Sequence, residues 1–448
     1  MSNSEMQDGQ RSVSLKEACW YWLKLGFISF GGPAGQIAIM HHDLVEKKHW
    51  ISEKRFLHAL NYCMLLPGPE AQQLATYIGW LLHRTWGGLI AGGLFVLPSL
   101  LILIVLTWVY LSYGHLPQIA GALYGIKPAV VAIVLFAAYR IGSRVLKHAA
   151  LWLISVAAFL AVAWFSLPFP YVVLSAAILG YAGSLIRPAI FSRPQEMQAE
   201  PHSAGPAVIG DHTPTPDHAL FRFRHFLRLL VAGLAVWALA LGVLIWLYGW
   251  QATLTQMGWF FTKAALLTFG GAYAVLPYVN EGAVQTYAWL TPTQMMDGLA
   301  LGETTPGPLI MLVAFVGFVG GWTQQIFGSD SLFLAGALAA CVATFFTFLP
   351  SFLFIFIGAP FIESSQGNLK FSAPLTGITA AIVGVIFNLA LYFAYHVIWP
   401  AGWNSELDIF SLFATVAALV ALFFYKVGIL RLIGSFALAG IAHHALLA

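Results

Sequence analysis

Two stretches of this chain, residues 24–73 and residues 263–312, superimpose at one constant offset without a gap. Each stretch contains Phe-Gly-Gly, then a tryptophan, then Pro-Gly-Pro, all within apolar sequence. Because so many features rarely share one register by chance, we interpret the chain as an internal duplication in which each copy carries two glycine/proline breaks. The matched positions are Lys24 with Lys263; Phe30, Gly31 and Gly32 with Phe269, Gly270 and Gly271; Trp50 with Trp289; and Pro67, Gly68 and Pro69 with Pro306, Gly307 and Pro308.

The sequence around these breaks is that of a membrane protein. Hydrophobic residues make up 59% of the 448 residues and charged residues only 9%, whereas a soluble domain carries about 25% charged residues. Apolar runs long enough to span a bilayer as helices recur along nearly the whole chain, and the short alternating segments of a β-barrel are missing. The composition therefore predicts an all-α polytopic membrane protein.

The duplication also predicts how the chain is divided. A second offset aligns the later parts of the copies, pairing Leu97, Pro98 and Ser99 with Leu349, Pro350 and Ser351. The region between the copies is rich in proline, histidine and charge, so we interpret it as a flexible, solvated linker. The predicted parts are a polar tail (1–14), a first membrane repeat (15–186), a polar cytoplasmic linker (187–227), an unpaired transmembrane helix (228–249) and a second membrane repeat (250–448).

An unpaired helix between two repeats of six hydrophobic elements would reverse the second repeat relative to the first. Charge agrees with this inversion, because the connector 41–55 holds four Lys or Arg residues and its partner 280–294 holds none, which places them on opposite sides of the membrane. Inverted repeats with broken helices are typical of transporters whose site lies near the bilayer midplane. The predicted N-terminus is cytoplasmic and the C-terminus periplasmic.

The remaining clusters of Lys and Arg are also expected on the cytoplasmic side. This placement requires the two broken elements of each repeat to turn back as re-entrant hairpins. Each has about 25 residues, enough for two half-helices of about 18 Å. Glycine and proline suit the tips of such hairpins. The alternative is that all thirteen elements cross the membrane.

The helix starts that follow these breaks are candidate anion sites. Unpaired backbone N–H groups and the positive end of the helix dipole meet at a helix N-terminus, and together they bind anions without any side chain. Pro33, Pro69 and Pro308 suit the first turn of such a half-helix. The alternative is that these residues only let the hairpins pack closely.

Two lysines hold equivalent places before the Phe-Gly-Gly breaks. Lys24 lies two helical turns before Gly31, and Lys263 lies equally far before Gly270. A lysine within an apolar segment is costly and usually functional. The alternative for both is that they extend to the lipid headgroups as anchors.

Other polar residues beside the Pro-Gly-Pro breaks are candidates for binding or proton coupling. Glu70 follows Pro69 and Glu303 precedes Pro306, so either carboxylate is a candidate proton carrier; the alternatives are a helix-terminus charge for Glu70 and a turn cap for Glu303. Gln72 and its neighbour Gln73 would donate hydrogen bonds to an oxyanion or only pack between helices.

No motif points to an enzyme, a cofactor or a metal site. Cys19, Cys63 and Cys341 are scattered and resemble packing residues, and the polar first ten residues predict no cleavable signal peptide. HExxH, GxSxG and P-loop patterns are missing from the sequence.

These motifs resemble those of the two-domain, long-chain bacterial chromate transporter family. The stretches FISFGGPAGQ with LLPGPEAQQ, and LTFGGAYAVLP with ETTPGPLIM, carry the resemblance, which covers both halves. It implies proton-driven efflux of chromate across the inner membrane, with sulfate as a competing or exchanged oxyanion. The carried-over motif positions are Phe30, Gly31, Gly32, Pro33, Pro67, Gly68, Pro69, Phe269, Gly270, Gly271, Pro306, Gly307 and Pro308. Ala272 stands where the first copy has Pro33, so the two tips need not contribute equally.

The residues alone support an inverted-repeat secondary transporter for an anion, with a sulfate or other oxyanion exchanger and an anion channel as alternatives. The expected partners are chromate, sulfate and the lipid bilayer, without nucleic acid. A homodimer is the candidate assembly.

Overall fold

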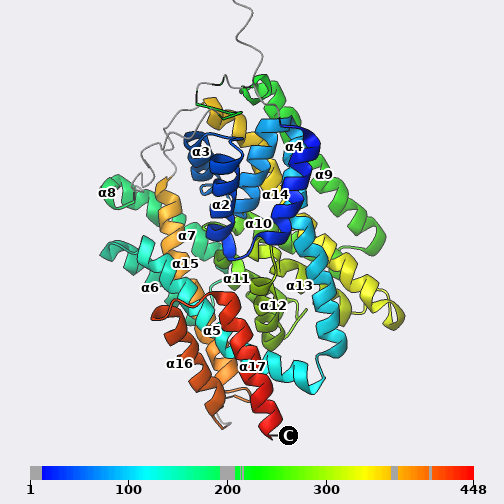
Figure 1. Ribbon diagram of the computed structural model, residues 1–448. Coiled ribbons are helices and arrows are strands. Elements are labelled where there is room, and N and C mark those ends of the chain that lie inside the picture. The colour runs from blue at the N-terminus through cyan, green and yellow to red at the C-terminus, as the bar shows by residue number, and fades with distance from the viewer. Residues whose placement is uncertain are drawn as a thin grey trace, which may run out of the picture.

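The computed structural model describes residues 13–191, 207–211, 213, 216–364, 372–402 and 406–447, and these residues are mostly helical (Figure 1). Seven of the helices are long and apolar enough to cross a membrane, so the prediction of an all-α polytopic membrane protein is confirmed. Most of the predicted tail lies outside the described residues. The helices are α1 (Leu15–Ile28), α2 (Gly32–His41), α3 (Glu53–Cys63), α4 (Glu70–Tyr113), α5 (Pro117–Val145), α6 (Ala149–Ala163), α7 (Phe169–Ile186), α8 (Pro188–Phe191), α9 (Phe223–Tyr248), α10 (Thr253–Leu267), α11 (Ala272–Asn280), α12 (Pro292–Thr304), α13 (Leu312–Thr323), α14 (Leu332–Ser364), α15 (Ser372–Ile398), α16 (Ile409–Phe423) and α17 (Ile429–Leu447).

The first broken element is a hairpin of α1 and α2. Its two ends lie on the same side, because Lys48 Nζ, after α2, is 3.1 Å from Glu17 Oε1 in the first turn of α1. The rings of Tyr21 and Trp50 also pack edge to face, with centroids 5.2 Å apart. At the tip, Gly31 has a φ of 90°, a conformation that glycine adopts without a steric penalty.

The second broken element is a hairpin of α3 and the first segment of α4. Both of its ends meet the linker: the Ser52 N–H donates to the Ile209 carbonyl at 2.9 Å, and a ring nitrogen of His218 lies 3.0 Å from the Trp80 carbonyl oxygen. Proline ends the break, since Pro69 immediately precedes α4. The described residues therefore fold both broken elements of the first repeat as hairpins, and their re-entry into the membrane stays a prediction.

Helix α4 is two antiparallel segments rather than one long helix. The backbone leaves helical geometry at His83 and Arg84, where Arg84 has a φ of 56°. The chain then folds back tightly, because a methyl group on Gly79 would lie 2.5 Å from the Gly87 carbonyl oxygen. Only glycine at this contact lets the two segments approach so closely.

The second repeat builds the same pair of hairpins from α10–α11 and α12–α13. The Tyr287 hydroxyl donates to Gln256 Oε1 at 3.3 Å, joining the connector to the first turn of α10. The Thr323 hydroxyl at the end of α13 donates to the Trp289 carbonyl at 3.0 Å. Both connectors begin with a six-residue π-helix, His42–Lys47 and Glu281–Thr286, at equivalent positions.

The last helices of each repeat pack against the other repeat. In the first repeat, α5 contacts α17 where Gly125 faces the Phe436 carbonyl and Gly440. In the second repeat, α15 contacts α7 where Gly377 faces the Ala176 carbonyl and Gly180. Glycine on both helices permits this backbone contact. One hydrophobic cluster contains residues of both halves, and the hairpins of the first repeat form a second cluster.

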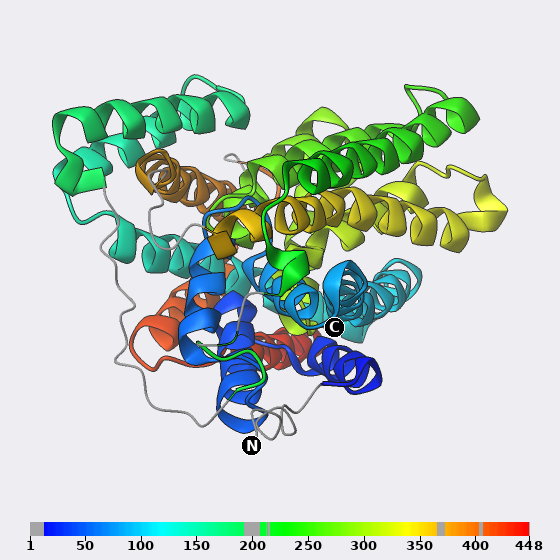
Figure 2. The ribbon, with the colours of Figure 1, turned by 90° about the horizontal axis from the view of Figure 1, so that it is seen from above.

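Helix α9 stands at the edge of the molecule beside α14, as both ribbon views show (Figures 1 and 2). Only 6% of its most apolar window is buried, which suits a helix that faces lipid on most of its circumference. Gly233 lets the Leu353 side chain of α14 lie close to the backbone of α9.

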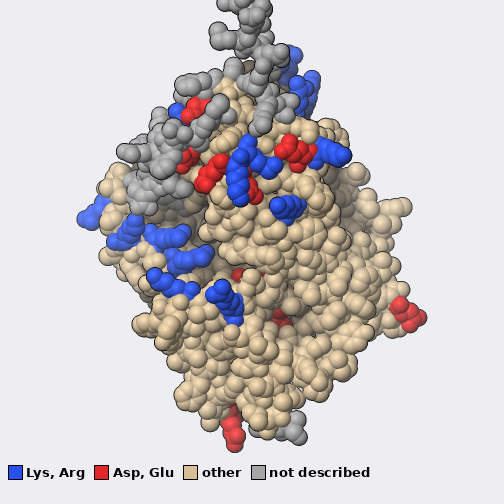
Figure 3. All heavy atoms as spheres, in the orientation of Figure 1, with Lys and Arg blue, Asp and Glu red and all other residues tan. Residues whose placement is uncertain are grey.

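Charged side chains are unevenly distributed on the surface. Figure 3 shows Lys and Arg over the upper half of the molecule and down its left flank to mid-height, while the lower end shows only acidic side chains. The C-terminal end of α17 lies at that lower end (Figure 1).

Candidate functional site

The four breaks of the two repeats meet at the centre of the molecule. The Gly68 N–H donates to the Thr268 carbonyl at 2.7 Å, and the Gly307 N–H donates to the Ser29 carbonyl at 2.8 Å. Gly68 and Gly307 are equivalent positions of the two copies, as are Ser29 and Thr268. Each Pro-Gly-Pro break therefore bonds to the Phe-Gly-Gly break of the opposite repeat.

Two serines close these junctions from the following long helices. A Cβ on Gly68, whose φ is 129°, would lie 2.5 Å from Ser351 Oγ. A Cβ on Gly307, whose φ is 102°, would lie 2.8 Å from Ser99 Cβ. The aligned Leu-Pro-Ser sequences thus serve the same contact in both halves, and no other residue than glycine fits either position.

Three glutamine side chains are buried around the junctions. Gln36 Nε2 donates to the Gly307 carbonyl at 2.5 Å, and Gln73 Nε2 donates to the Pro67 carbonyl at 2.8 Å. Gln72 Nε2 donates to the Thr76 hydroxyl at 3.0 Å. The Oε1 atom of each glutamine is buried without a hydrogen-bond partner among the described residues, which leaves acceptors in the site for a hydrogen-bond donor such as water.

The Phe-Gly-Gly tips border open space. A Cβ built on Gly31, Gly32 or Gly271 would meet no atom within 4 Å. Helix α2 begins at Gly32 and α11 begins directly after Gly271, so the unpaired N–H groups of their first turns lie at the tips. Figure 3 shows a hollow near the middle of the molecule with acidic atoms inside it.

Glu303 is a buried carboxylate of this site. It lies in the last turn of α12, just before the Pro-Gly-Pro break, and accepts a hydrogen bond from the Tyr273 hydroxyl in the first turn of α11. Arg140 of α5 is near enough to interact electrostatically with both side chains. A carboxylate and a phenol from two helices are therefore hydrogen-bonded between the two breaks of the second repeat, within electrostatic range of a cation on a third.

Asp297 forms a second buried acid on the same helix. It accepts a hydrogen bond from the Tyr110 hydroxyl at 2.9 Å, and Lys127 of α5 is within electrostatic range. Each of the two acids of α12 thus accepts a hydrogen bond from one tyrosine and has one cation of α5 within electrostatic range.

The other predicted site residues differ in position. Glu70 is half-buried as the first residue of α4. Lys24 is exposed and forms no ion pair with a described residue. Lys263 is partly buried, with its Nζ 5.7 Å from the Trp259 ring centroid, a cation–π contact. The structure therefore links Glu303 to the second repeat's Phe-Gly-Gly break through its hydrogen bond with Tyr273, and no contact among the described residues links either lysine to the breaks.

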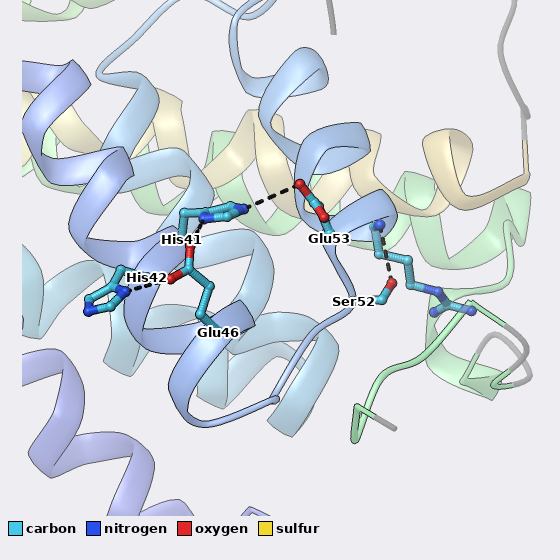
Figure 4. A network of polar contacts seen from close by, with 6 residues as sticks. His41, His42, Glu46, Ser52 and Glu53 are labelled. Atoms are coloured by element: carbon cyan, nitrogen blue, oxygen red, sulfur yellow. Dashed lines mark hydrogen bonds and ion pairs between the residues drawn. The ribbon is translucent and has the colours of Figure 1, made fainter. Parts of the chain in front are cut away.

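A polar cluster covers the connector between the first two hairpins (Figure 4). Glu46 bonds to His42 Nδ1 at 2.7 Å and His41 Nδ1 at 3.1 Å, and His41 Nε2 lies 3.8 Å from Glu53 Oε1. The hydrogen bond from His42 is the main cause that lowers the pKa of the Glu46 carboxyl. This exposed cluster holds the connector in shape and is separate from the central site.

Sequence reasoning missed several residues of the site. Gln36 carried a usable signal, because it is a lone amide in the apolar stretch after Pro33. Tyr273, Asp297 and Lys127 did as well, since polar groups within apolar elements are candidates by default. Which acid each tyrosine would meet depends on helix packing that no local pattern contains.

Comparison with known proteins gives one family. The chain matches the family model described as chromate transporter over residues 16–181 and 255–441. It is 29% identical to the chromate transport protein of Cupriavidus metallidurans, over 97% of this chain and 95% of the relative. It is 31% identical to the chromate transport protein of Pseudomonas aeruginosa, over 82% of this chain and 77% of the relative. No solved structure matches the chain.

Proposed function

The chain belongs to the chromate transporter family, and we propose that it carries chromate out of the cytoplasm as a secondary active transporter. It is a multi-pass membrane protein and a transporter rather than an enzyme. Export, its coupling to a gradient and residence in the bacterial inner membrane belong to the proposal.

The proposal includes two repeats of inverted topology, with the N-terminus cytoplasmic and the C-terminus periplasmic. Two observations support it. The Lys and Arg residues of the connector 41–55 have no counterpart in 280–294. The hydrogen bonds of Gly68 and Gly307 are also reciprocal, as a two-fold relation between the repeats requires.

The observation that carries the substrate proposal is that each Pro-Gly-Pro break bonds to the Phe-Gly-Gly break of the opposite repeat. Helix N-termini supply N–H groups there, and such groups match a tetrahedral oxyanion. The substrate-binding set comprises Lys24, Phe30, Gly31, Gly32, Pro33, Pro67, Gly68, Pro69, Gln72, Lys263, Phe269, Gly270, Gly271, Pro306, Gly307 and Pro308. Gln36 and Gln73 join it on the contacts described above. Sulfate, which has the same shape and charge, competes for the site.

Glu303 is the proposed proton-coupling residue, and Glu70 is the second candidate. A protonated Glu303 tolerates a dianion beside it, whereas an ionised one repels it in a medium of low dielectric constant. Exchange of chromate for protons would then follow from alternate occupation of one site. The contact of Glu303 with Tyr273, and its position between the two breaks, place this residue ahead of Glu70.

The test is uptake of labelled chromate into inverted membrane vesicles, with and without a pH gradient. We expect saturable uptake that sulfate inhibits and that a protonophore reduces. Uptake that does not saturate and ignores the gradient would indicate an anion channel. Sulfate uptake with no response to chromate would assign another oxyanion.

A further inference from the structure

Two adjoining cavities lie where the linker meets α4 and α9. One has a volume of about 280 Å³ and is lined by residues of the linker and the start of α9. The other has a volume of about 480 Å³ and is lined by α1, the turn within α4 and the linker. His218 lines both, so the two cavities form one groove.

The first cavity is strongly basic. Arg222, Arg224, His225 and Arg228 line it, together with Leu220 and His218. The three arginines are exposed, and none forms an ion pair with a described residue. Guanidinium groups bind phosphate through paired N–H donors, so this end of the groove suits a phosphate group.

The second cavity is mainly apolar. Leu15, Leu81, Leu82 and Trp86 line it, with Arg84 and His83 at the turn within α4. The Trp86 side chain is 74% exposed, which is typical of a tryptophan at the membrane–water interface. A hydrocarbon chain would cover these side chains, whereas a free inorganic ion would not.

The groove also lies at the level of lipid headgroups. Arg222 directly precedes α9, whose apolar flank is turned outward, and Phe223 is 66% exposed. The positive charge of this end is expected on the cytoplasmic side, where the membrane surface is negative and attracts basic clusters.

We propose that this groove binds one anionic phospholipid, with its phosphate against the arginines of α9 and an acyl chain against Trp86 and the leucines. His218 contacts the Trp80 carbonyl oxygen at 3.0 Å and packs against the Trp80 ring. A bound lipid would therefore join α9 and the linker to the hairpin of α3 and α4, and would stabilise their association.

The experiment uses the purified full-length protein in detergent. Retention of phosphatidylglycerol is measured by native mass spectrometry, and the melting temperature is measured with added phosphatidylglycerol or phosphatidylcholine. We expect phosphatidylglycerol alone to be retained and to raise the melting temperature. The triple variant Arg222→Gln, Arg224→Gln, Arg228→Gln should bind it about tenfold more weakly or worse.

A matched control removes the same charge elsewhere. Arg144→Gln, Arg187→Gln, Arg431→Gln changes three exposed arginines outside the groove and should retain the lipid like the parent. Trp86→Ala should weaken binding of long-chain phosphatidylglycerol and leave a short-chain form unaffected. Because the readout is binding, it is independent of chromate transport.

Three outcomes would overturn the proposal. The triple variant and the control could retain the lipid equally. Phosphatidylcholine could bind as tightly as phosphatidylglycerol. Inorganic phosphate or chromate could displace the lipid and raise the melting temperature of the unsubstituted protein, but not of the triple variant, as much as the lipid does. That result would assign a free-anion site instead.

Discussion

The backbone N–H of Gly68 donates to the carbonyl oxygen of Thr268, a residue of the other repeat, at 2.7 Å. The equivalent pair, Gly307 and Ser29, repeats this bond at 2.8 Å. Such bonds satisfy backbone groups that the helix breaks leave open at membrane depth, where an unpaired group costs several kcal/mol. The two halves are thus joined at the positions where each is least regular.

Gly307→Ala should destabilise the protein. Its φ of 102° strains any other residue, at a cost on the order of 1–3 kcal/mol, and the new methyl group would lie 2.8 Å from Ser99 Cβ. Ser99→Gly in the same chain should recover part of the loss, because it removes the clash but not the strain. The fraction of protein that survives heating, measured by fluorescence-detected size-exclusion chromatography, reports the loss of stability and its recovery. Gly93→Ala, in a helix with open space around it, is the control. A Gly307→Ala protein as stable as this control would contradict the assignment.

Gln36→Leu should weaken chromate binding about tenfold, because it removes a buried amide that bonds to the Gly307 carbonyl. Binding is measured with labelled chromate on the purified protein. Gln324→Leu changes an exposed glutamine and should bind normally. Equal binding by both variants would exclude Gln36 from the site.

Lys24→Ala and Lys263→Ala should both weaken chromate binding while folded protein remains in the membrane. A compact cation attracts a dianion far more strongly in a medium of low dielectric constant than in water. The measurement is chromate resistance of cells at matched expression. Parental resistance in both variants would show that the lysines are anchors. The exposed position of Lys24 makes its variant the more informative of the two.

Glu303→Gln should retain chromate binding and lose the pH-gradient dependence of transport. The amide accepts the Tyr273 hydrogen bond but releases no proton. Counterflow driven by a gradient of substrate alone should survive, since exchange of one chromate for another moves no proton and no net charge. Glu70→Gln serves as the comparison. Unchanged pH dependence in both variants would reject carboxylate coupling at these sites.

Single-cysteine labelling tests the topology, in a background without Cys19, Cys63 and Cys341. Cysteines at Lys47 and Lys147 should react from the cytoplasm, and one at Thr286 from the outside. Labelling of Lys47 and Thr286 from the same side would refute the inversion. Labelling of the cysteine at position 47 from the cytoplasm and of that at position 147 from the outside would refute the hairpins instead.

The sequence predicted the local structure of the breaks because glycine and proline act locally. Residues 29–31 and 64–69 do interrupt the helices, and Pro33 stands in the first turn of α2. The charges of the connector also indicated that both ends of a hairpin lie on one side. The ion pair between Lys48 and Glu17 is consistent with this.

Contacts between distant segments could not be predicted. Nothing near Glu303 indicates that Tyr273 will meet it, and nothing in the linker indicates that Ile209 pairs with Ser52. Those partners depend on helix packing, which small residues such as Gly125 and Gly377 permit without specifying. The described part of the linker is accordingly docked, whereas its composition suggested only a solvated chain.

The reciprocal bonds of the breaks set an order for biogenesis. Ser29 enters the membrane early, yet its backbone partner Gly307 is synthesised only after α9 and three further helices. Until then, the first half has to persist in the bilayer without the bond from Gly307 to Ser29 and with an open Gly68 N–H group, a state that favours temporary partners such as water, lipid or an insertion factor. The last steps of folding are therefore the closing of both junctions together, and a chain stopped after α7 would have no mature site at all.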